Sequence, residues 1–350
     1  MSYTIALNFE DGVTRFISCK EGETVLDAAY RHKVNLPMDC SDGVCGTCKG
    51  SCEQGAFDLG DEYIDEALSD EEVAEGKVLT CQMVPSSDCV VQVPVASTLC
   101  KTAVGEFPAR VVEVSRLSED SFELVVDLDE GEGLAFLPGQ YVNIQVPGSD
   151  ETRSYSFSSA PGERRTSFLI RNVPNGLMSG YLSAEAKPED ALSLTGPMGS
   201  FYLREVKRPV LMLAGGTGLA PFLSMLRQLR EQGCDRPVRL LYGVNVDDHL
   251  VKLDELDALV EALPDFAYTT VVADAASEHM RKGYVTHHMA PELLHDGDVD
   301  VYLCGPPPMV DAVLTHFREQ GIAPASFHYE KFAPSLAPEE AKGTAREAVA

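Results

Sequence analysis

Residues 38–55 read MDCSDGVCGTCKGSCEQG, and this stretch decides the fold of the N-terminal part of the chain. It spaces three cysteines as C-x4-C-x2-C, and a fourth follows a short apolar run in VLTCQMVP. Two irons need four thiolate ligands, and this is the plant-type spacing for a [2Fe–2S] cluster. The interspersed glycines let the backbone curl around a cluster and turn N–H groups toward its sulfurs. The pattern predicts that the cluster ligands are Cys40, Cys45, Cys48 and Cys81.

A zinc site or reduced structural thiols are the alternatives for this cysteine cluster. Zinc sites usually pair two C-x2-C knuckles, and Cys81 has no such partner. Cys52 is a rival ligand, but it lies beyond the loop and we expect it to pack as a small apolar residue. The same structural role is expected of Cys19, Cys89, Cys100 and Cys234.

The segment before the loop reads EGETVLDAAYRHKV and predicts a short helix. Thr24 is the expected N-cap, with Asp27 three residues later. The apolar face of the helix would consist of Val25, Leu26, Ala29 and Tyr30. With a preceding β-hairpin and the following cysteine loop, residues 1–97 resemble the plant-type ferredoxins, which implies a β-grasp α+β fold.

Composition bounds the function of the chain. Its 350 residues predict more than one domain, and 55 Asp and Glu against 28 Lys and Arg give a net charge of −27. Phosphate backbones repel such a chain, so we expect no nucleic-acid partner. The uncharged run at residues 209–226 contains AGGTGLAP, which would break a spanning helix. Because the N-terminus also lacks a signal-peptide pattern, we expect no membrane association and a cytoplasmic location.

Two further segments differ from the first in their patterning. Residues 106–205 contain short β-branched runs between Gly and Pro turns, such as SFELVVDL and QYVNIQV, which predict an antiparallel β-barrel or sandwich, and we favour the barrel. Residues 206–332 alternate compact apolar strands with helical patterns that end at Gly233 and Gly321, which predicts an α/β domain with a parallel sheet. Residues 98–105 are the expected linker, and residues 333–350 the expected flexible tail.

The sequence RSYSFSS, residues 153–159, follows one of these strands. Alone it would be explained by an ordinary strand with alternating polar residues. In its position it resembles the R-x-Y-S motif of the ferredoxin–NADP reductase superfamily, which implies a flavin site. Arg153 would pair with the pyrophosphate, Tyr155 would lie against the isoalloxazine, and the Ser156 hydroxyl would reach flavin N5. The resemblance extends to a second phosphate contact at Gly176 and Ser179, and it favours FAD over FMN.

The stretch LAGGTGLAPFLSML runs from a strand through a glycine-rich turn into a helix. It is not G-x-G-x-x-G, but close backbone approach and a helix N-terminus favour a phosphate there. It resembles the nucleotide loop of the same superfamily, and YLCGPPPMV at residues 302–310 resembles the second half of that signature. The implied NADH-binding residues are Gly215, Gly216, Thr217, Gly218 and Gly305, with Cys304 near the nicotinamide. Outside this context Cys304 would be an ordinary buried residue at a strand end.

Three acidic or aromatic residues complete the predicted site. Asp247 and Asp248 follow the strand VRLLYGV, where carboxylates would repel a 2′-phosphate and could bind a ribose hydroxyl. We therefore expect NADH rather than NADPH, with Asp247 as the candidate contact, Asp248 as its alternative, and a simply solvated carboxylate as the alternative for either. In FHYEKF the resemblance implies that Phe332 covers the flavin and that Glu330 lies beside the nicotinamide, although Phe332 would equally suit a core. Ser156, Cys304 and Glu330 are the predicted catalytic residues.

The order of ferredoxin, flavin barrel and nucleotide domain closely resembles the reductase components of benzoate-type 1,2-dioxygenases, including those for toluate and anthranilate. This implies electron transfer from NADH through FAD and the [2Fe–2S] cluster to a Rieske-type terminal oxygenase. A reductase for a diiron monooxygenase of the phenol hydroxylase type would share all three motifs. A non-enzymatic iron–sulfur redox sensor and a zinc-bound interaction protein are alternatives of other classes, but neither needs the flavin and nucleotide motifs.

Overall fold

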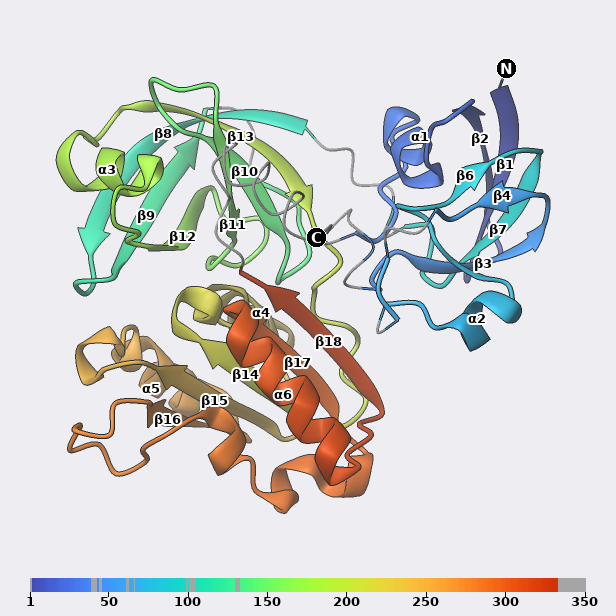
Figure 1. Cartoon of the computed structure of the whole chain (residues 1–350). Helices are drawn as coiled ribbons and strands as arrows, with labels where there is room; N and C mark the ends of the chain where they lie inside the picture. The colour runs from blue at the N-terminus through green and yellow to red at the C-terminus, as the bar shows by residue number, and fades with distance from the viewer. Residues whose placement is uncertain are drawn as a thin grey trace, which may run out of the picture. The chain divides into compact units, whose positions relative to one another are not determined.

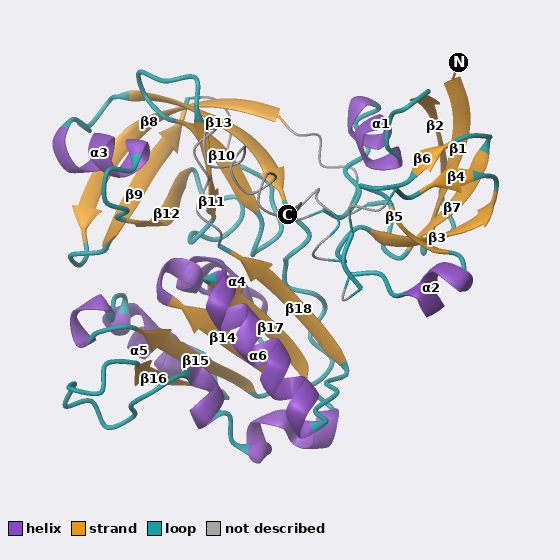
Figure 2. Ribbon diagram, in the orientation of Figure 1, coloured by secondary structure: helices purple, strands orange, loops and turns teal. Residues whose placement is uncertain are grey.

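The computed structural model describes residues 2–38, 43, 46–60, 63–65, 67–98, 100, 105–129 and 133–332 (Figures 1 and 2). The chain divides into two compact units. The first comprises Met1–Phe107, Gln140–Val142 and Thr195–Tyr202, and the second comprises Pro108–Gly139, Asn143–Leu194 and Leu203–Ala350. Within the described residues no helix is both long and apolar enough to span a bilayer. The predicted tail and most of the predicted linker lie outside the described residues.

The N-terminal domain is built on a five-stranded sheet in the order β2-β1-β7-β3-β5. Strands β1 and β7 are parallel, whereas β1 with β2, β3 with β5 and β3 with β7 are antiparallel. A two-stranded sheet pairs β4 with β6. This arrangement confirms the predicted β-grasp fold. The bounds are β1 Ser2–Phe9, β2 Thr14–Lys20, α1 Val25–Arg31, β3 Lys49–Gln54, β4 Phe57–Asp58, α2 Asp70–Ala74, β5 Lys77–Leu79, β6 Val84–Pro85 and β7 Cys89–Val93.

Helix α1 begins as the sequence predicts. The Thr24 side chain accepts a hydrogen bond from the Asp27 amide at 3.1 Å, which supplies one of the missing partners at the start of a helix. Val25 and Leu26 are buried, and they join the core with Ile5 and Leu7 of β1. The helix therefore covers one face of the sheet and fixes the approach to the cysteine loop.

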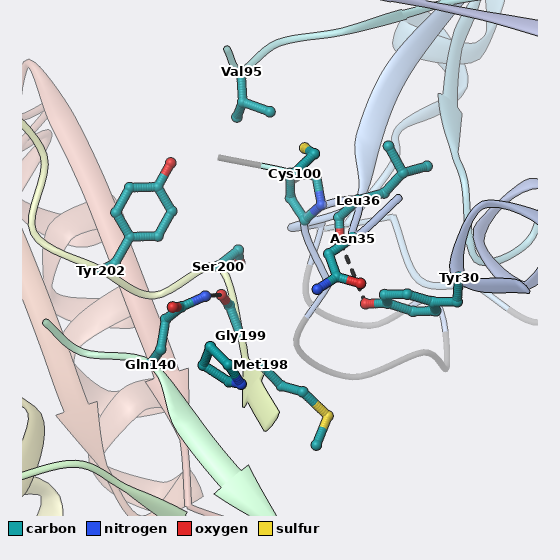
Figure 3. A pocket seen from close by; sticks show the side chains of 12 residues that line it. Tyr30, Asn35, Leu36, Val95, Cys100, Gln140, Met198, Gly199, Ser200 and Tyr202 are labelled. Atoms are coloured by element: carbon teal, nitrogen blue, oxygen red, sulfur yellow. Dashed lines mark hydrogen bonds between the residues drawn. The ribbon is translucent and has the colours of Figure 1, made fainter. Parts of the chain in front are cut away.

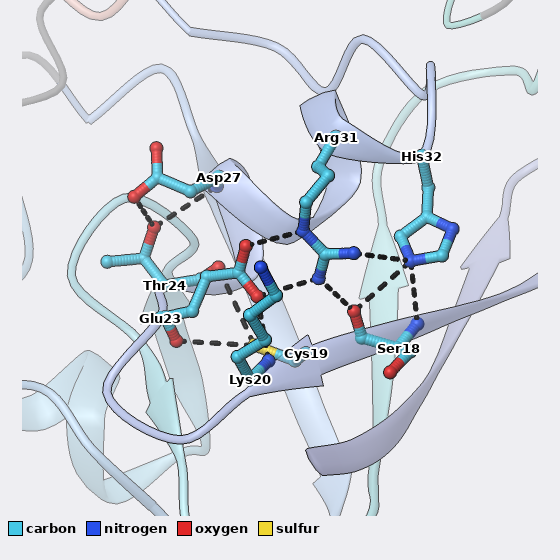
Figure 4. Close-up of polar contacts among 8 residues, drawn as sticks. All are labelled: Ser18, Cys19, Lys20, Glu23, Thr24, Asp27, Arg31 and His32. Atoms are coloured by element: carbon cyan, nitrogen blue, oxygen red, sulfur yellow. Dashed lines mark hydrogen bonds and ion pairs between the residues drawn. The ribbon is translucent and has the colours of Figure 1, made fainter.

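Side chains from α1, from its C-cap His32 and from the loop that precedes α1 cap the edge strand β2 (Figure 4). Arg31 donates to the Ser18 carbonyl and holds both carboxylate oxygens of Glu23, at 2.8 and 2.7 Å. His32 Nε2 lies 3.2 Å from the amide nitrogen of Ser18, and the Lys20 amide donates to Glu23 at 2.7 Å. These contacts occupy backbone groups that an edge strand would otherwise offer to another chain.

The second domain contains a six-stranded sheet in the order β11-β10-β13-β8-β9-β12. An antiparallel bridge between Phe157 and Phe168 joins the end of β11 to β12, so the first and last strands of this order meet. The near-closure confirms the predicted antiparallel barrel. The bounds are β8 Gly105–Arg116, β9 Ser121–Leu128, β10 Tyr141–Gln145, β11 Thr152–Ser156, β12 Arg165–Arg171, α3 Leu177–Ala184 and β13 Ala191–Met198.

The third domain is a parallel sheet in the order β16-β15-β14-β17-β18, as predicted for an α/β fold. From β14, strands β15 and β16 are added toward one edge of the sheet, and β17 and β18 are then added toward the other edge. Ligands of such sheets bind where the order reverses, at the carboxyl ends of those two strands. The bounds are β14 Val210–Gly215, α4 Ala220–Gln232, β15 Val238–Val244, α5 Leu253–Ala262, β16 Phe266–Val272, β17 Asp300–Gly305, α6 Pro307–Gln320 and β18 Ser326–Lys331, with 3₁₀ turns η1 Gly216–Leu219, η2 Asp247–His249, η3 Val285–His288 and η4 Pro291–Gly297.

Candidate functional site

Two of the four predicted cluster cysteines lie side by side in the N-terminal domain. The sulfurs of Cys48 and Cys81 are 3.2 Å apart, and the residues are 4% and 6% exposed. The Thr80 amide donates to the Cys48 carbonyl at 3.1 Å and so ties the segment after β5 to the end of the cysteine loop. Cys40 and Cys45 lie outside the described residues.

The surroundings of these two thiols fit an iron–sulfur group. Two sulfurs at this separation can bind one metal ion, which is what two of the four ligands of a cluster must do. Beside Cys81, the Thr80 hydroxyl is buried and has no hydrogen-bond partner among the described residues. Buried hydroxyls rarely remain unpartnered, so this one fits a site whose acceptor is a cofactor atom rather than a protein atom.

Cys52, the rival ligand, lies on β3 and donates to the Gln54 carbonyl at 3.3 Å. Burial raises the pKa of Cys52 to about 11, and it likewise raises the pKa of Cys19 to about 11 and that of Cys100 to about 12. Cys19 and Cys100 are buried in the hydrophobic core of the domain and Cys52 packs against that core, which favours the structural roles expected for the three residues.

The predicted flavin residues Arg153, Tyr155 and Ser156 all lie on β11, which ends at Ser156. Arg153 Nη1 pairs with Glu151 at 3.1 Å, and its side chain is only 25% exposed. Burial raises the pKa of Tyr155, so its hydroxyl stays protonated. Ser156 is 3% exposed. The strand thus offers a cation, an aromatic ring and a buried hydroxyl within four residues.

Gly176 and Ser179 lie at the start of α3. Gly176 is the N-cap, and no side chain caps the helix there. The Ser179 hydroxyl accepts a hydrogen bond from the Val173 amide at 2.8 Å and donates one to the Arg171 carbonyl at 3.3 Å. Its visible role is to hold the turn between β12 and α3. The amides at the helix start therefore suit an anion better than the Ser179 hydroxyl does.

The glycine-rich loop forms η1, between β14 and α4. A Cβ on Gly218 would lie 2.4 Å from the Cys304 carbonyl oxygen, so only glycine lets the loop pack against β17. At Gly216 the backbone is left-handed, with φ +55°, and a Cβ there would meet nothing within 4 Å. Gly216 and Thr217 are half-buried, and Gly215 is buried at the end of β14. One side of the loop is therefore fixed by the sheet and the other is open to a ligand.

The three predicted catalytic residues converge on one carboxylate oxygen. Ser156 donates from Oγ to Glu330 Oε2 at 3.1 Å, and Cys304 Sγ lies 3.9 Å from the same oxygen. Cys304 and Glu330 face each other in the β17–β18 register, and Glu330 is 8% exposed. The Phe332 amide donates to the Gly305 carbonyl at 2.9 Å, which fixes the end of β18 beside that of β17. The buried carboxylate thus joins the flavin-binding sheet to the switch point of the nucleotide domain.

Asp247 begins η2, after β15, and is exposed. Its Oδ1 accepts a hydrogen bond from the Ser277 hydroxyl at 2.8 Å, and the Ser277 hydroxyl accepts one from the His279 amide at 2.9 Å. The sequence analysis missed Ser277, as it missed Thr80. Ser277 belongs to no motif, and Thr80 directly precedes the predicted ligand Cys81 in VLTCQMVP, but only the folded chain shows what surrounds the two hydroxyls.

The first unit also contains a pocket lined by Tyr30, Leu36, Gln140, Gly199 and their neighbours (Figure 3). The Tyr30 hydroxyl donates to the Leu36 carbonyl at 3.3 Å, and Gln140 Nε2 donates to the Gly199 carbonyl at 3.0 Å. None of the predicted site residues that the structure describes lines this pocket. It therefore does not contribute to the candidate site.

Comparison with known families agrees with the three-part architecture. Residues 8–86 match the 2Fe-2S iron-sulfur cluster binding domain, residues 108–202 the oxidoreductase FAD-binding domain, and residues 212–315 the oxidoreductase NAD-binding domain. The chain thus has domains for a [2Fe–2S] cluster, FAD and a nicotinamide nucleotide.

Relatives match nearly the whole chain. The toluate 1,2-dioxygenase electron transfer component of Pseudomonas putida is 55% identical, covering 96% of this chain and 100% of the relative. The 2-halobenzoate 1,2-dioxygenase electron transfer component of Burkholderia cepacia is 49% identical, with 96% and 99% covered. The propane 2-monooxygenase reductase component of a Gordonia species is 33% identical, with 89% and 92% covered.

Among solved structures, the Amycolatopsis cytochrome P450 reductase GcoB superposes with a TM-score of 0.72. It is 32% identical, and the match covers 95% of this chain and 99% of that one. Fold, domain order and sequence identity over the full length agree. The chain belongs to the family of electron transfer components of aromatic-ring 1,2-dioxygenases, and it is an NAD(P)H-dependent flavin and iron–sulfur oxidoreductase.

Proposed function

We propose that this chain carries electrons from NADH through FAD and a [2Fe–2S] cluster to the Rieske-type terminal oxygenase of a benzoate 1,2-dioxygenase. The proposed division of labour follows the chain: a ferredoxin domain at residues 1–97, a linker at 98–105, a flavin domain at 106–205 and a nucleotide domain at 206–332. The observation that carries the proposal is the convergence of Ser156 and Cys304 on the Glu330 carboxylate.

Bound FAD would accept a hydride from NADH and release electrons one at a time, which suits a one-electron acceptor. The chain's residues would position the two reactants. Ser156 donates a hydrogen bond to Glu330, and this orients its hydroxyl at the end of β11, where flavin N5 is expected. Glu330 and Cys304, at the carboxyl ends of adjacent strands, would face the nicotinamide. Because Glu330 is buried, it can hold this geometry without competition from water.

The remaining predicted contacts would hold the phosphates and rings. Arg153 would exchange its pairing with Glu151 for the flavin pyrophosphate, with the uncapped start of α3 at Gly176 and Ser179 beside it. Gly215, Gly216, Thr217 and Gly218 would receive the NADH phosphates, and Gly305 would admit the nicotinamide. Phe332, half-buried after β18, would cover the flavin. Cys40, Cys45, Cys48 and Cys81 would bind the cluster.

The preference for NADH rests on Asp247. Its carboxylate is oriented by Ser277 at the carboxyl edge of the sheet, where the nucleotide ribose of such folds lies. A 2′-phosphate would meet this negative charge, whereas ribose hydroxyls could donate to it. We also propose a cytoplasmic location, where NADH is supplied and the eight described cysteines, none in a disulfide, would stay reduced.

The benzoate-type partner is supported by the curated relatives, whose names specify toluate and 2-halobenzoate, both substituted benzoates. An acidic face on the ferredoxin domain would suit a basic patch on the oxygenase. Glu71 is exposed on α2 and suits this role, whereas Glu72 closes the capping box with Ser69 and pairs with Lys49 at 2.6 Å. Neutralising Glu71 therefore tests docking, whereas neutralising Glu72 would also weaken α2.

Stopped-flow kinetics with the holoenzyme test this proposal. The flavin should be reduced far faster by NADH than by NADPH, and the reduced protein should then reduce a benzoate 1,2-dioxygenase oxygenase. An equal rate with NADPH would refute the NADH assignment. Failure to reduce any ring-carboxylate oxygenase, with normal NADH oxidation, would refute the partner.

The similarity to a propane 2-monooxygenase reductase component supports a monooxygenase as a second candidate partner, which we take to be of the diiron type. Its identity of 33%, against 55% and 49%, favours the dioxygenase. A diiron oxygenase of the phenol hydroxylase type, assayed beside the Rieske-type oxygenase with the same reduced protein, separates the two partners.

A further inference from the structure

Lys252 breaks three local preferences at the start of α5. Its backbone is left-handed, with φ +62°, which is uncommon for a residue with a long side chain. It occupies the N-cap but makes no side-chain cap hydrogen bond. It also places a cation at the positive end of the helix dipole. Residues that break local rules in this way are usually retained for contacts elsewhere.

The Lys252 side chain makes such a contact. Its ammonium lies 2.6 Å from Glu123 Oε1, and both side chains are only 16% exposed. The same ammonium lies 3.7 Å from Glu255, one turn into α5, and Arg227 binds Glu255 at 2.7 Å. Partly buried pairs of this kind are screened less by solvent than surface ion pairs. The four residues form one ionic chain.

The ends of this ionic chain belong to the two nucleotide-binding parts of the second unit. Glu123 lies on β9, which is hydrogen-bonded between β8 and β12 in the flavin-binding sheet. Arg227 lies on α4, the helix that continues directly from the glycine-rich loop η1 (Figure 1). The chain of charges therefore joins a central barrel strand to the helix behind the predicted NADH phosphate site.

The segment that carries Lys252 is fixed from both sides. In the nucleotide domain, the hydroxyl of buried Tyr242 donates to the His249 carbonyl at 3.3 Å and accepts from the Val251 amide at 3.4 Å. On the barrel side, His249 Nδ1 lies 3.1 Å from Asp120, which immediately precedes β9. Lys252 is thus held where a small shift would move α4 and η1 relative to β9.

We propose that Lys252 is a positioning residue for hydride transfer, whose ion pair with Glu123 sets the nucleotide domain against the flavin-binding sheet. The inference rests on NADH reducing the flavin of this chain. In this role neither Lys252 nor Glu123 contacts the flavin or NADH. Since a shift of about 1 Å between reacting groups can slow a reaction roughly 100-fold, a loosened contact should slow flavin reduction.

The test is Lys252→Gly, because glycine adopts the left-handed conformation without strain and removes the ion pair. In the holoenzyme we expect the rate of flavin reduction at saturating NADH to fall about 10-fold. The apparent Kd for NADH should change by less than about 2-fold, since uniform binding is untouched. Hydrogen exchange should quicken both in β9 and at the start of α5. Unchanged exchange in β9 or an unchanged reduction rate would overturn the inference.

Two further variants keep the result interpretable. Lys33 is also left-handed, with φ +60°, but it is exposed in the N-terminal domain, so Lys33→Gly should leave flavin reduction unchanged. Glu123→Gln removes the same ion pair from the other side and should match Lys252→Gly; if it does not, the pair is not the cause. If NADH did not reduce the flavin of the wild-type protein, the proposed function itself would be refuted. If the wild-type protein and both ion-pair variants were reduced at the same rate, only the role of Lys252 would be refuted.

Discussion

The two proposed redox sites of this protein are assembled in opposite ways. Cys48 and Cys81 are 33 residues apart; Cys48 directly precedes β3, and Cys81 follows β5, the strand paired with β3. The other predicted ligands, Cys40 and Cys45, belong to the same stretch of sequence as Cys48. Ser156 on β11 and Glu330 on β18 are 174 residues apart and belong to different domains. They meet only because those two domains pack together. The proposed electron exit is therefore built mostly from one loop, whereas the proposed electron entrance depends on domain packing. Substitutions at the first should abolish one cofactor, and substitutions at the second should slow a reaction while the cofactors remain bound.

The largest effect should follow from Cys81→Ser. Loss of one thiolate should prevent cluster assembly, and electron transfer to the oxygenase should fall by at least about 100-fold while NADH still reduces the flavin. Visible spectra and single-turnover kinetics measure both. Cys234→Ser is the matched control, because Cys234 is half-exposed and donates to the Arg236 carbonyl at 3.4 Å, in a different domain from the predicted ligands. Retention of a full cluster in Cys81→Ser would contradict the ligand assignment.

Glu330→Gln tests the other side of the comparison. It keeps the size of the side chain but replaces the carboxyl group that Ser156 and Cys304 face with an amide, so we expect flavin reduction to slow by roughly 10- to 100-fold with FAD content unchanged. Stopped-flow reduction by NADH is the measurement. Asp311→Asn is the control. Asp311 lies on α6 and pairs with Lys331, the residue after Glu330 on β18, but its side chain is 61% exposed. Wild-type kinetics in Glu330→Gln would remove the carboxylate from the proposed role.

Gly218→Ala should damage the entrance through packing. The added Cβ would lie 2.4 Å from the Cys304 carbonyl oxygen, and backbone cannot move aside cheaply. We expect the free energy of unfolding to fall by roughly 1–3 kcal/mol and the KM for NADH to rise. Gly180→Ala, inside α3 with nothing within 4 Å of the added atom, should instead stabilise by about 0.5–1 kcal/mol. Equal melting temperatures for the two variants would show that the loop does not pack as described.

The smallest effect concerns the cap on β2 in the N-terminal domain. Hydrogen bonds from Arg31 lower the pKa of Glu23 from 4.5 to about 2. A carboxylate whose pKa is lower in the folded chain than in the unfolded chain stabilises the fold at pH values above the unfolded pKa. For Glu23 this contribution disappears as the pH falls from about 4.5 to 2. Arg31→Met should therefore lower the free energy of unfolding slightly near neutral pH and hardly at all near pH 2, and the effect should be small because the Arg31 side chain is 35% exposed.

Urea unfolding across this pH range measures the difference. Arg31→Lys keeps the charge but loses the paired hydrogen bonds to Glu23, so its cost should be intermediate. A cost that does not change with pH would show that Arg31 acts through its bond to the Ser18 carbonyl and not through Glu23.

Much of the fold could be predicted because its signals are local. The Thr24 cap and the glycines that end α4 and α6 lie within a few residues of the elements that they bound, and all appear as predicted. The strand order β16-β15-β14-β17-β18 has no such local signal, since it depends on how helices cross the sheet.

The same distinction holds for the site. The spacing of the cysteines pointed to a cluster, and motif resemblance pointed to Ser156, Cys304 and Glu330, although their common oxygen could not be foreseen. Ser277, Thr80 and the pair of Lys252 with Glu123 were missed, because each acts through a partner that is distant in sequence or through a cofactor. Local sequence offers no pattern for such contacts.

The most direct test of the account is an anaerobic titration of the intact protein with NADH, followed by visible absorption. The account predicts flavin and iron–sulfur bands in the oxidised protein and bleaching of both as NADH is added, because the entrance and exit are coupled. Bleaching of the flavin alone, with the cluster bands intact, would contradict the proposed path from Ser156 and Glu330 to Cys48 and Cys81.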